Sequence, residues 1–214
     1  GSSAHANGLF MGYPKTTSAT ATRNYIANCG GGAGGTGITS GGDLGPDFST
    51  NLAVTNNLIS NATYGIAGYL GTGCTIKANV VVSGVNSFFG VAGQFNDMTV
   101  GGTGGGEGNT ITGMSSALGA AIAVANTTAL PRTFGNVLVI GNTLSNNTNQ
   151  MIFDVALTVR TSTQPGAATI DATSLAQMIA DNALDRAVYI TQPGGALRTE
   201  TGSPLTLVVV RSSI

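Results

Sequence analysis

The stretch "NNLISNATYGI", residues 56–66, contains a pattern that recurs along this chain of 214 residues. In five places an asparagine stands two residues before an apolar residue. These pairs are Asn24 with Ile26, Asn57 with Ile59, Asn79 with Val81, Asn109 with Ile111, and Asn142 with Leu144. The spacings between successive asparagines are 33, 22, 30 and 33 residues. A recurring unit of this length predicts a repeat architecture, in which each copy packs against the next.

Each copy also contains a five-residue step that a straight strand does not explain. Val54 and Ile59 are five residues apart, and the same step recurs from Ile76 to Val81. In one straight strand, strict alternation would point the two side chains to opposite faces. Asparagine tolerates the left-handed conformation, and one left-handed residue turns the chain and resets the alternation. The sequence therefore predicts a corner between the two apolar residues, with both side chains pointing inward.

A third apolar position follows seven residues after the central one. It is occupied by Ile66, Phe88, Leu118 and Met151, while the insertion "CGGGAGGTGI" moves the expected site of the first copy to Ile38. Each copy thus reads as two or three short strands, which form one coil stacked on the next at about 4.8 Å. The repeated asparagines are expected to stack as an amide ladder. An ordinary β-sandwich is the alternative, because it also has short strands and frequent turns.

The pattern resembles the right-handed parallel β-helix family, which includes pectate lyases, many bacteriophage tailspikes and some adhesins. The residues that carry the resemblance are Val54, Asn57, Ile59, Asn61, Gly65, Ile66 and their equivalents, over about residues 20–155. The resemblance implies an all-β fold, a right-handed parallel β-helix (solenoid). We divide the chain into a leading segment (1–19), the coils (20–155) and a C-terminal element (156–214).

The C-terminal element differs from the coils in its pattern. In "TSLAQMIADNALD" the apolar residues have helical spacing, and Thr173 or Ser174 is the expected N-cap. Strand-like stretches broken by glycine and proline follow it. We expect a small β-rich element with one helix, which caps the solenoid or holds a trimer together.

Composition limits the classes of function. Charged residues make up only 8% of the chain, and the eight Lys and Arg residues form no run. This excludes a basic nucleic-acid surface, and the longest apolar stretch is too short to span a membrane. With one histidine, His5, a Ser-His-Asp triad or a multi-histidine metal site is disfavoured. We predict no metal and no cofactor, and we read Cys29 and Cys74 as buried thiols while leaving a single bridge open.

Positions just after each corner should face solvent, yet several are apolar. They are Tyr25, Leu58 and Val80, and the same position becomes polar at Thr110 and Thr143. An apolar stripe on the outside of a solenoid indicates packing against a neighbouring chain. The resemblance to tailspikes, many of which are parallel homotrimers, implies the same partner.

Hydrolysis of a polysaccharide needs two carboxylates, about 5 to 9.5 Å apart depending on the mechanism. Asp97 and Glu107 bracket the strand "MTV" and are the first candidates for a catalytic pair, with Asp43 and Asp47 as the alternative. A calcium-dependent lyase is less favoured, because the acids are not clustered and no basic residue stands among them. Whether the chain is an enzyme is left open.

Sugar binding requires polar side chains and an aromatic platform. Tyr64 and Tyr69 lie beside the second coil, and Asp154 is expected to point outward from the last coil. Together with the resemblance, these residues favour a tailspike-like receptor-binding protein of the virion tail, which recognises, and in one reading depolymerises, a capsular or O-antigen polysaccharide. The alternative is a β-helical adhesin segment of the bacterial cell surface without enzymatic activity.

Overall fold

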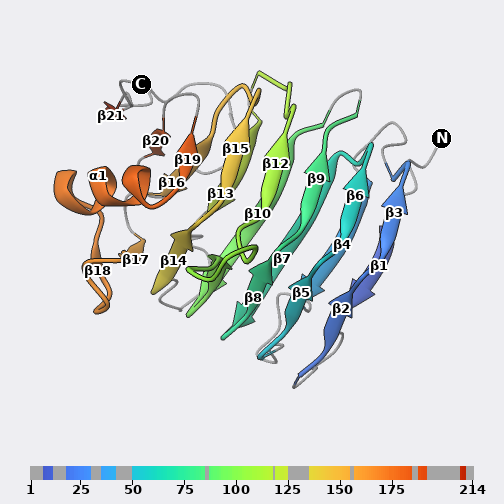
Figure 1. The fold of residues 1–214 in the computed structure, drawn as a ribbon, viewed down its shortest axis with the longest axis horizontal. Coiled ribbons are helices and arrows are strands. Elements are labelled where there is room, and N and C mark those ends of the chain that lie inside the picture. Colours follow the sequence, from blue (N-terminus) through green and yellow to red (C-terminus); the bar gives the residue numbers. More distant parts are fainter. Residues whose placement is uncertain are drawn as a thin grey trace.

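The computed structural model describes residues 7–11, 18–29, 35–41, 50–84, 87–117, 119–124, 135–154, 157–184, 188–191 and 208–210. The chain is mostly β-structure, with strands stacked in three predominantly parallel sheets and one helix (Figure 1). This confirms the expected all-β class, and the stack is compatible with a β-helix.

Three sheets run the length of the stack. Sheet A contains, in spatial order, β1 (Asn7–Met11), β4 (Thr36–Gly41), β7 (Tyr64–Thr72), β10 (Phe89–Asn96), β13 (Ala120–Val124), β16 (Met151–Asp154), β20 (Val188–Thr191) and β21 (Val208–Val210). Sheet B contains β2 (Thr20–Thr22), β5 (Ala53–Thr55), β8 (Thr75–Lys77), β11 (Thr99–Gly101), β14 (Val137–Ile140), β17 (Thr158–Arg160) and β18 (Ala168–Thr169). Sheet C contains β3 (Tyr25–Ala27), β6 (Leu58–Ser60), β9 (Val80–Val82), β12 (Thr110–Thr112), β15 (Thr143–Ser145) and β19 (Ala183–Leu184).

The chain visits the sheets in a fixed order. After β5 in sheet B it forms β6 in sheet C and β7 in sheet A, and then returns to sheet B with β8. Neighbouring strands pair in parallel, except β17 with β18 and β20 with β21. Strands that follow one another within a coil therefore lie in different sheets, while equivalent strands of successive coils lie side by side.

The predicted corner lies between sheets B and C. Val54 and Ile59 are both buried, with 1% and 0% of their surface exposed, so both side chains point inward as expected. The left-handed residue is the one before the repeated asparagine: Asn56 has φ 57°, and its equivalents Arg23 and Ala78 have φ 58° and 55°. The corner therefore does not require asparagine in every coil.

The repeated asparagines form the expected amide ladder inside this corner. The Oδ1 atom of Asn57 accepts hydrogen bonds from the backbone N–H and the Nδ2 of Asn24, at 3.0 and 2.9 Å. The Nδ2 of Asn57 donates in turn to the Oδ1 of Asn79 at 2.9 Å and to the carbonyl of Ala21 at 3.0 Å. The ladder continues through Asn109 and Asn142, and it ends at a sixth rung that the repeat did not reveal, Asn182.

The seven-residue spacing predicted the third apolar position correctly in some coils and wrongly in others. In sheet A, Ile38 pairs with Ile66, as expected. The next residues in this row are Val91 and Ile122, followed by Met151, and the expected Phe88 is instead half-buried next to the row. Leu118 lies outside the described residues. The connection from sheet C to sheet A varies in length, so a fixed seven-residue step loses the register.

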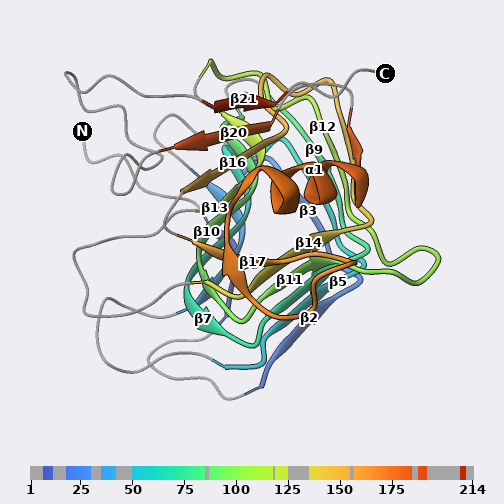
Figure 2. The ribbon, with the colours of Figure 1, turned by 90° about the vertical axis from the view of Figure 1, so that its left-hand side faces the viewer.

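The helix α1 (Ala172–Ala180) covers the last coil. Its N-cap is Asp171 and not Thr173 or Ser174, so the helix begins two or three residues earlier than expected, and Asp171 and Ser174 form a capping box. Leu175 and Met178 are buried in the hydrophobic core, and Figure 2 shows α1 across the end of the stacked coils. Strands β17, β19 and β20 extend the three sheets past residue 155, while the proposed division into domains stays a prediction.

Candidate functional site

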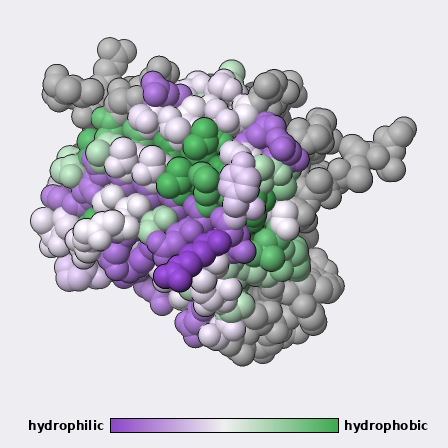
Figure 3. Space-filling model, turned by 45° about the vertical axis from the view of Figure 1, so that its right-hand side comes forward, coloured by the Kyte–Doolittle hydropathy of each residue, from purple (hydrophilic) through white to green (hydrophobic). Residues whose placement is uncertain are grey.

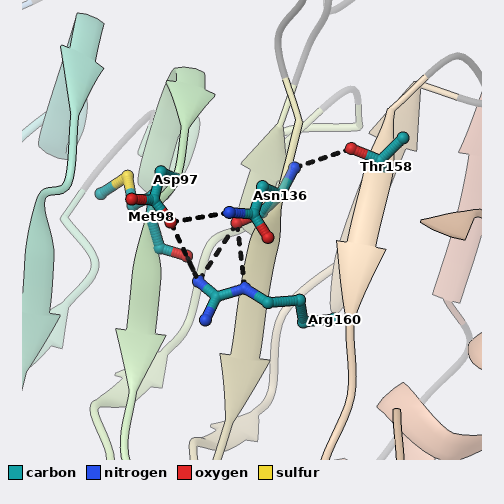
Figure 4. A network of polar contacts seen from close by, with 5 residues as sticks. All are labelled: Asp97, Met98, Asn136, Thr158 and Arg160. Atoms are coloured by element: carbon teal, nitrogen blue, oxygen red, sulfur yellow. Dashed lines mark hydrogen bonds and ion pairs between the residues drawn. The ribbon is translucent and has the colours of Figure 1, made fainter. Parts of the chain in front are cut away.

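Asp97 lies at a corner between sheets A and B, where it belongs to a polar network across three coils (Figure 4). Its Oδ1 accepts a hydrogen bond from the Nδ2 of Asn136 at 2.7 Å and lies 3.7 Å from Nη2 of Arg160. Asp97 and Asn136 both have positive φ, of 52° and 55°, so the tight corner fixes where their side chains start. The Asp97 carboxylate is about half exposed and is reachable from solvent.

Arg160, at the end of β17, contacts the two preceding coils. Its Nε and Nη2 donate to the carbonyl of Asn136 at 3.3 and 3.2 Å, and Nη2 also donates to the carbonyl of Met98 at 3.4 Å. Thr158, on the same strand, accepts the backbone N–H of Asn136 at 2.8 Å. Strand β17 is thereby tied to the two preceding coils through the backbone carbonyls of Asn136 and Met98, the second of which also accepts the N–H of Leu138.

This arrangement predicts that Arg160 stabilises the fold mainly through the carbonyls. Arg160→Ala should lower the free energy of unfolding by about 2 kcal/mol, because it removes the charged hydrogen bonds from the guanidinium to the carbonyls of Asn136 and Met98. Asp97→Asn should cost less than about 1 kcal/mol, since an ion pair this exposed contributes little and the asparagine can still accept from Asn136. Urea unfolding of both variants measures the difference. Equal losses in the two variants would contradict this assignment.

Glu107 lies at the other end of the sheet B strand, after the loop that follows β11. Its Oε1 is 3.3 Å from Nζ of Lys77, and its Oε2 accepts the backbone N–H of Gly104 at 3.0 Å. The Gly104 N–H and the Lys77 side chain lower the pKa of Glu107. A general acid needs a raised pKa, so Glu107 suits the part of the carboxylate in a two-carboxylate mechanism.

The two first-choice carboxylates are held separately. The backbone of Glu107 is equivalent to that of Lys77 in the preceding coil. The carbonyl of Glu107 accepts the N–H of the corner residue Ala78, just as the carbonyl of Lys77 accepts the N–H of the corner residue Asn56. In β11 the residue at this register position is Gly101, and Asp97 stands four residues before it. Four residues span about 13 Å along a strand. Each carboxylate has its own basic partner, Arg160 for Asp97 and Lys77 for Glu107. Catalysis by this pair stays a prediction.

The remaining predicted site residues are placed in part. Tyr64 begins β7 and is half-buried, with its ring centre 5.8 Å from that of Phe89 and 6.2 Å from that of Phe88. Tyr69 and Asp154 lie in strands β7 and β16, but their side chains are outside the described part of the structure. Asp43 and Asp47 also lie outside the described residues. Tyr64 therefore joins an aromatic cluster on sheet A.

The predicted apolar stripe is present on the outer face of sheet C. Tyr25 pairs with Leu58 and Leu58 with Val80, and the row continues into Thr110 and Thr143. Tyr25 is 71% exposed, Leu58 40% and Val80 38%. Figure 3 shows hydrophobic side chains gathered on this side of the molecule.

Val82, which the sequence did not single out, belongs to the same surface and is 38% exposed. It stands two residues after Val80 on β9, so it points to the same side as the stripe. We call Tyr25, Leu58, Val80 and Val82 the apolar face of sheet C. Tyr25 is also the most exposed tyrosine whose side chain the structure describes, although sequence reasoning preferred Tyr64 and Tyr69 as sugar platforms.

Other kinds of site find little support among the described residues. Cys29 and Cys74 are free and buried, as expected, and burial raises the pKa of both thiols. Within the described ranges, no three His, Cys, Asp or Glu residues lie close enough together to hold a metal ion. The described part of the chain also contains no helix with the length and apolar character needed to cross a membrane.

Comparison with known proteins does not assign a function to this site. No family model, no curated protein and no solved structure matches the chain. The candidate site is therefore defined by the geometry of its own residues: the Asp97 network, the Glu107 pair and the apolar face of sheet C.

Proposed function

We propose that this chain is a tailspike-like receptor-binding protein whose coils close into a right-handed parallel β-helix. It assembles as a homotrimer through the apolar face of sheet C and recognises a capsular or O-antigen polysaccharide of a bacterial surface. It acts at the virion tail. The observation that carries the proposal is the row of exposed apolar side chains from Tyr25 to Val80 on a regular parallel sheet.

The apolar face is suited to contact with another copy of the chain. The strands of sheet C that carry it, β3, β6 and β9, contain no charged residue, so an interface there would bury no unpaired charge. Burial of exposed apolar surface stabilises association by about 25 cal/mol per Å². The side chains are also β-branched or aromatic for the most part, and they lose little rotational freedom when they pack.

Glycan recognition is supported by the outer face of sheet B. This face carries outward hydroxyls at successive coils, from Thr20, Thr22, Thr55, Thr75 and Thr99. Hydroxyls both donate and accept hydrogen bonds, so rows of them at strand spacing of about 4.8 Å suit a neutral, hydroxyl-rich polymer. Asp97 and Glu107 stand at the two ends of this face, where they can accept hydrogen bonds from sugar hydroxyls.

Recognition and cleavage are tested together on a panel of capsular and O-antigen glycans. The purified protein is expected to bind one glycan, with binding measured by retention on immobilised polysaccharide. Release of oligosaccharides, followed by mass spectrometry, decides whether the bound glycan is also cleaved. If it is, Asp97→Asn and Glu107→Gln should each abolish release while the protein stays folded. Full activity in both variants would rule out this pair as the catalytic residues.

The trimer is tested by a charge placed in the apolar face. Leu58→Arg should convert a species of about three times 21.2 kDa into one of 21.2 kDa, because an unpaired guanidinium cannot be buried between chains. Light scattering coupled to gel filtration gives the mass. Thr143→Arg is the matched control, since it lies in the same row at the hydroxyl end and should leave the trimer intact. A wild-type monomer would contradict the trimer and favour the alternative, a β-helical adhesin segment without enzymatic activity.

A further inference from the structure

The segment 168–184, which we call the lid, lies across the end of the stacked coils. It consists of β18, α1 and β19, and Figure 2 shows its helix over the open side of the stack. Two of its side chains, Leu175 and Met178, enter the hydrophobic core, with 1% and 0% of their surface exposed. The strands on either side of it, β17 and β20, pair with strands of the coils. The lid is therefore one stretch of chain between two anchored strands.

The strand pairing that attaches the lid to the coils is short at both ends. Ala168 and Thr169 pair with β17 in the antiparallel direction, and Ala183 and Leu184 pair with β15. A strand inside the stack, such as β12, pairs along its whole length with a neighbour on each side. Elements with few paired backbone groups open locally at a lower free energy than elements within a stack.

Helix α1 is too short to be stable by itself. It has nine residues, and helices of fewer than about 12 residues are marginal in water. The side chains of Thr173, Ala176 and Ala180 are exposed, so the helix packs on the coils with one face. Closure of the lid therefore depends on the burial of Leu175 and Met178 and on the polar contacts at the end of the helix.

Those polar contacts form a latch around the carboxylate of Asp181. Its Oδ2 accepts the backbone N–H of Ser162 at 2.8 Å, and its Oδ1 accepts the hydroxyl of the same serine. The Oδ1 also accepts a hydrogen bond from Nε2 of Gln177 at 2.7 Å. Ser162 follows β17, so the latch joins the end of α1 to the last strand before the lid. Ser162 is exposed, and water can replace these contacts when the lid opens.

The next residue, Asn182, connects the latch to the asparagine ladder. Its Oδ1 accepts hydrogen bonds from the backbone N–H and the Nδ2 of Asn142, at 3.0 and 2.9 Å. Its Nδ2 donates to the carbonyl of Met178 in α1 at 2.7 Å. Asn182 therefore leaves its rung when α1 moves away, and the latch and the last rung open and close together.

From these observations we infer that the lid is a conformational device, which opens as one unit while the coils stay folded and which the Asp181 carboxylate holds closed. The closed lid covers the end of the core and fills the rung at Asn142. The open lid exposes the apolar residues beneath α1 and frees the edge of β15. Closure thus keeps the end of the stack from pairing with other strands.

The test places a thiol beneath the lid by the substitution Met178→Cys. Native Cys74, which is free and buried within the coils, is the internal control. Labelling by a thiol reagent without denaturant is followed by mass spectrometry, and each rate is divided by that of the same thiol in the unfolded chain. The introduced thiol should be labelled at least about tenfold faster than Cys74, because the lid opens more often than the coils unfold.

Two further substitutions in this background separate the latch from general destabilisation. Asp181→Ala should accelerate labelling of the introduced thiol by about another tenfold, because it removes the acceptor of the latch, and it should leave the rate at Cys74 unchanged. Thr163→Ala is the matched control, since it removes an exposed hydroxyl from the same turn and leaves the contacts of Asp181 in place. It should change neither rate.

Hydrogen exchange of the unsubstituted protein tests the lid without any change in the core. The amides of α1 should exchange at least about tenfold faster than those of β9 and β12, and their exchange should depend less on urea, because opening of the lid exposes less surface than global unfolding. Equal labelling of the two thiols, no effect of Asp181→Ala, or one shared urea dependence for α1 and the coils would each overturn the inference. None of these results depends on glycan binding or on the trimer.

Discussion

Replacing Asn79 by alanine should lower the free energy of unfolding by about 4 kcal/mol, because each buried polar group left without a partner costs about 1 to 3 kcal/mol. The Asn79 side chain is in the middle of the ladder, and the residue is 1% exposed. Its removal leaves the backbone N–H of Asn57 without its acceptor, while the Nδ2 of Asn57 keeps only the carbonyls of Ala21 and Thr55. It also deprives the Val54 carbonyl and the Asn109 Oδ1 of one donor each. A loss of this size is a large part of the stability of an ordinary domain.

Urea unfolding followed by circular dichroism measures this effect. Asn24→Ala is the control, because the outermost rung is partly exposed and, among the described residues, its side chain donates only to Asn57 and Thr22. It should cost about 1 kcal/mol. Asn79→Asp tests the ladder in another way: it keeps the shape but turns a carboxylate oxygen towards the Oδ1 of Asn109. We expect Asn79→Asp to be at least as destabilising as Asn79→Ala. A loss below 1 kcal/mol for Asn79→Ala would show that the ladder does not hold the coils together.

The ladder was predictable because its chemistry repeats. Buried amides must find partners in neighbouring coils, so the same residue recurs at the same place in the pattern. The corner was predictable for a similar reason, since Val54 and Ile59 are both apolar and five residues apart. Its left-handed residue was not, because Arg23 and Ala78 adopt the conformation of Asn56. Once the ladder and the core fix the conformation of the turn, residues with no intrinsic preference for the left-handed conformation can also occupy this position.

Register in sheet A and the last rung could not be read from spacing alone. The chain between sheet C and sheet A differs in length from coil to coil, so Val91 rather than Phe88 lies beside Ile66. Asn182 escaped notice because α1 precedes it and places it 40 residues after Asn142. In both cases the contacts across coils determine the position, and the local pattern does not contain them.

The candidate site was predictable as residue types but not as partners. Asp97 and Glu107 could be named from their places around one strand, whereas the pairing of Asp97 with Arg160 depends on how many residues each intervening loop contains. The same is true of Lys77 and Glu107, which meet because the loop 102–106 returns Glu107 to the register of Lys77 in the preceding coil. The apolar face of sheet C was easier to predict from the sequence, because parallel stacking places the same outward position of every coil in one row.

Close contact between sheets A and C leads to the second large effect, at Gly90. The glycines Gly8, Gly37, Gly65 and Gly90 occupy equivalent positions of β1, β4, β7 and β10. Each faces the central apolar residue of the following coil in sheet C, as Gly65 faces Val81. A Cβ at Gly90 would lie 2.3 Å from Cγ2 of Ile111 and 2.6 Å from the carbonyl oxygen of Ala121 in the next strand. The Ile111 side chain can shift, but the carbonyl belongs to a paired strand and cannot.

Gly90→Ala should therefore lower the free energy of unfolding by about 3 kcal/mol, at the upper end of the usual cost of overpacking. Gly90→Val adds two more methyl groups between the sheets and should prevent accumulation of folded protein. Gly105→Ala is the matched control, because no atom lies within 4 Å of its added Cβ. Urea midpoints and the yield of soluble protein provide the measurements. If Gly90→Ala and Gly105→Ala unfolded at the same urea concentration, sheets A and C would have room between them, and the glycine row would not set their distance.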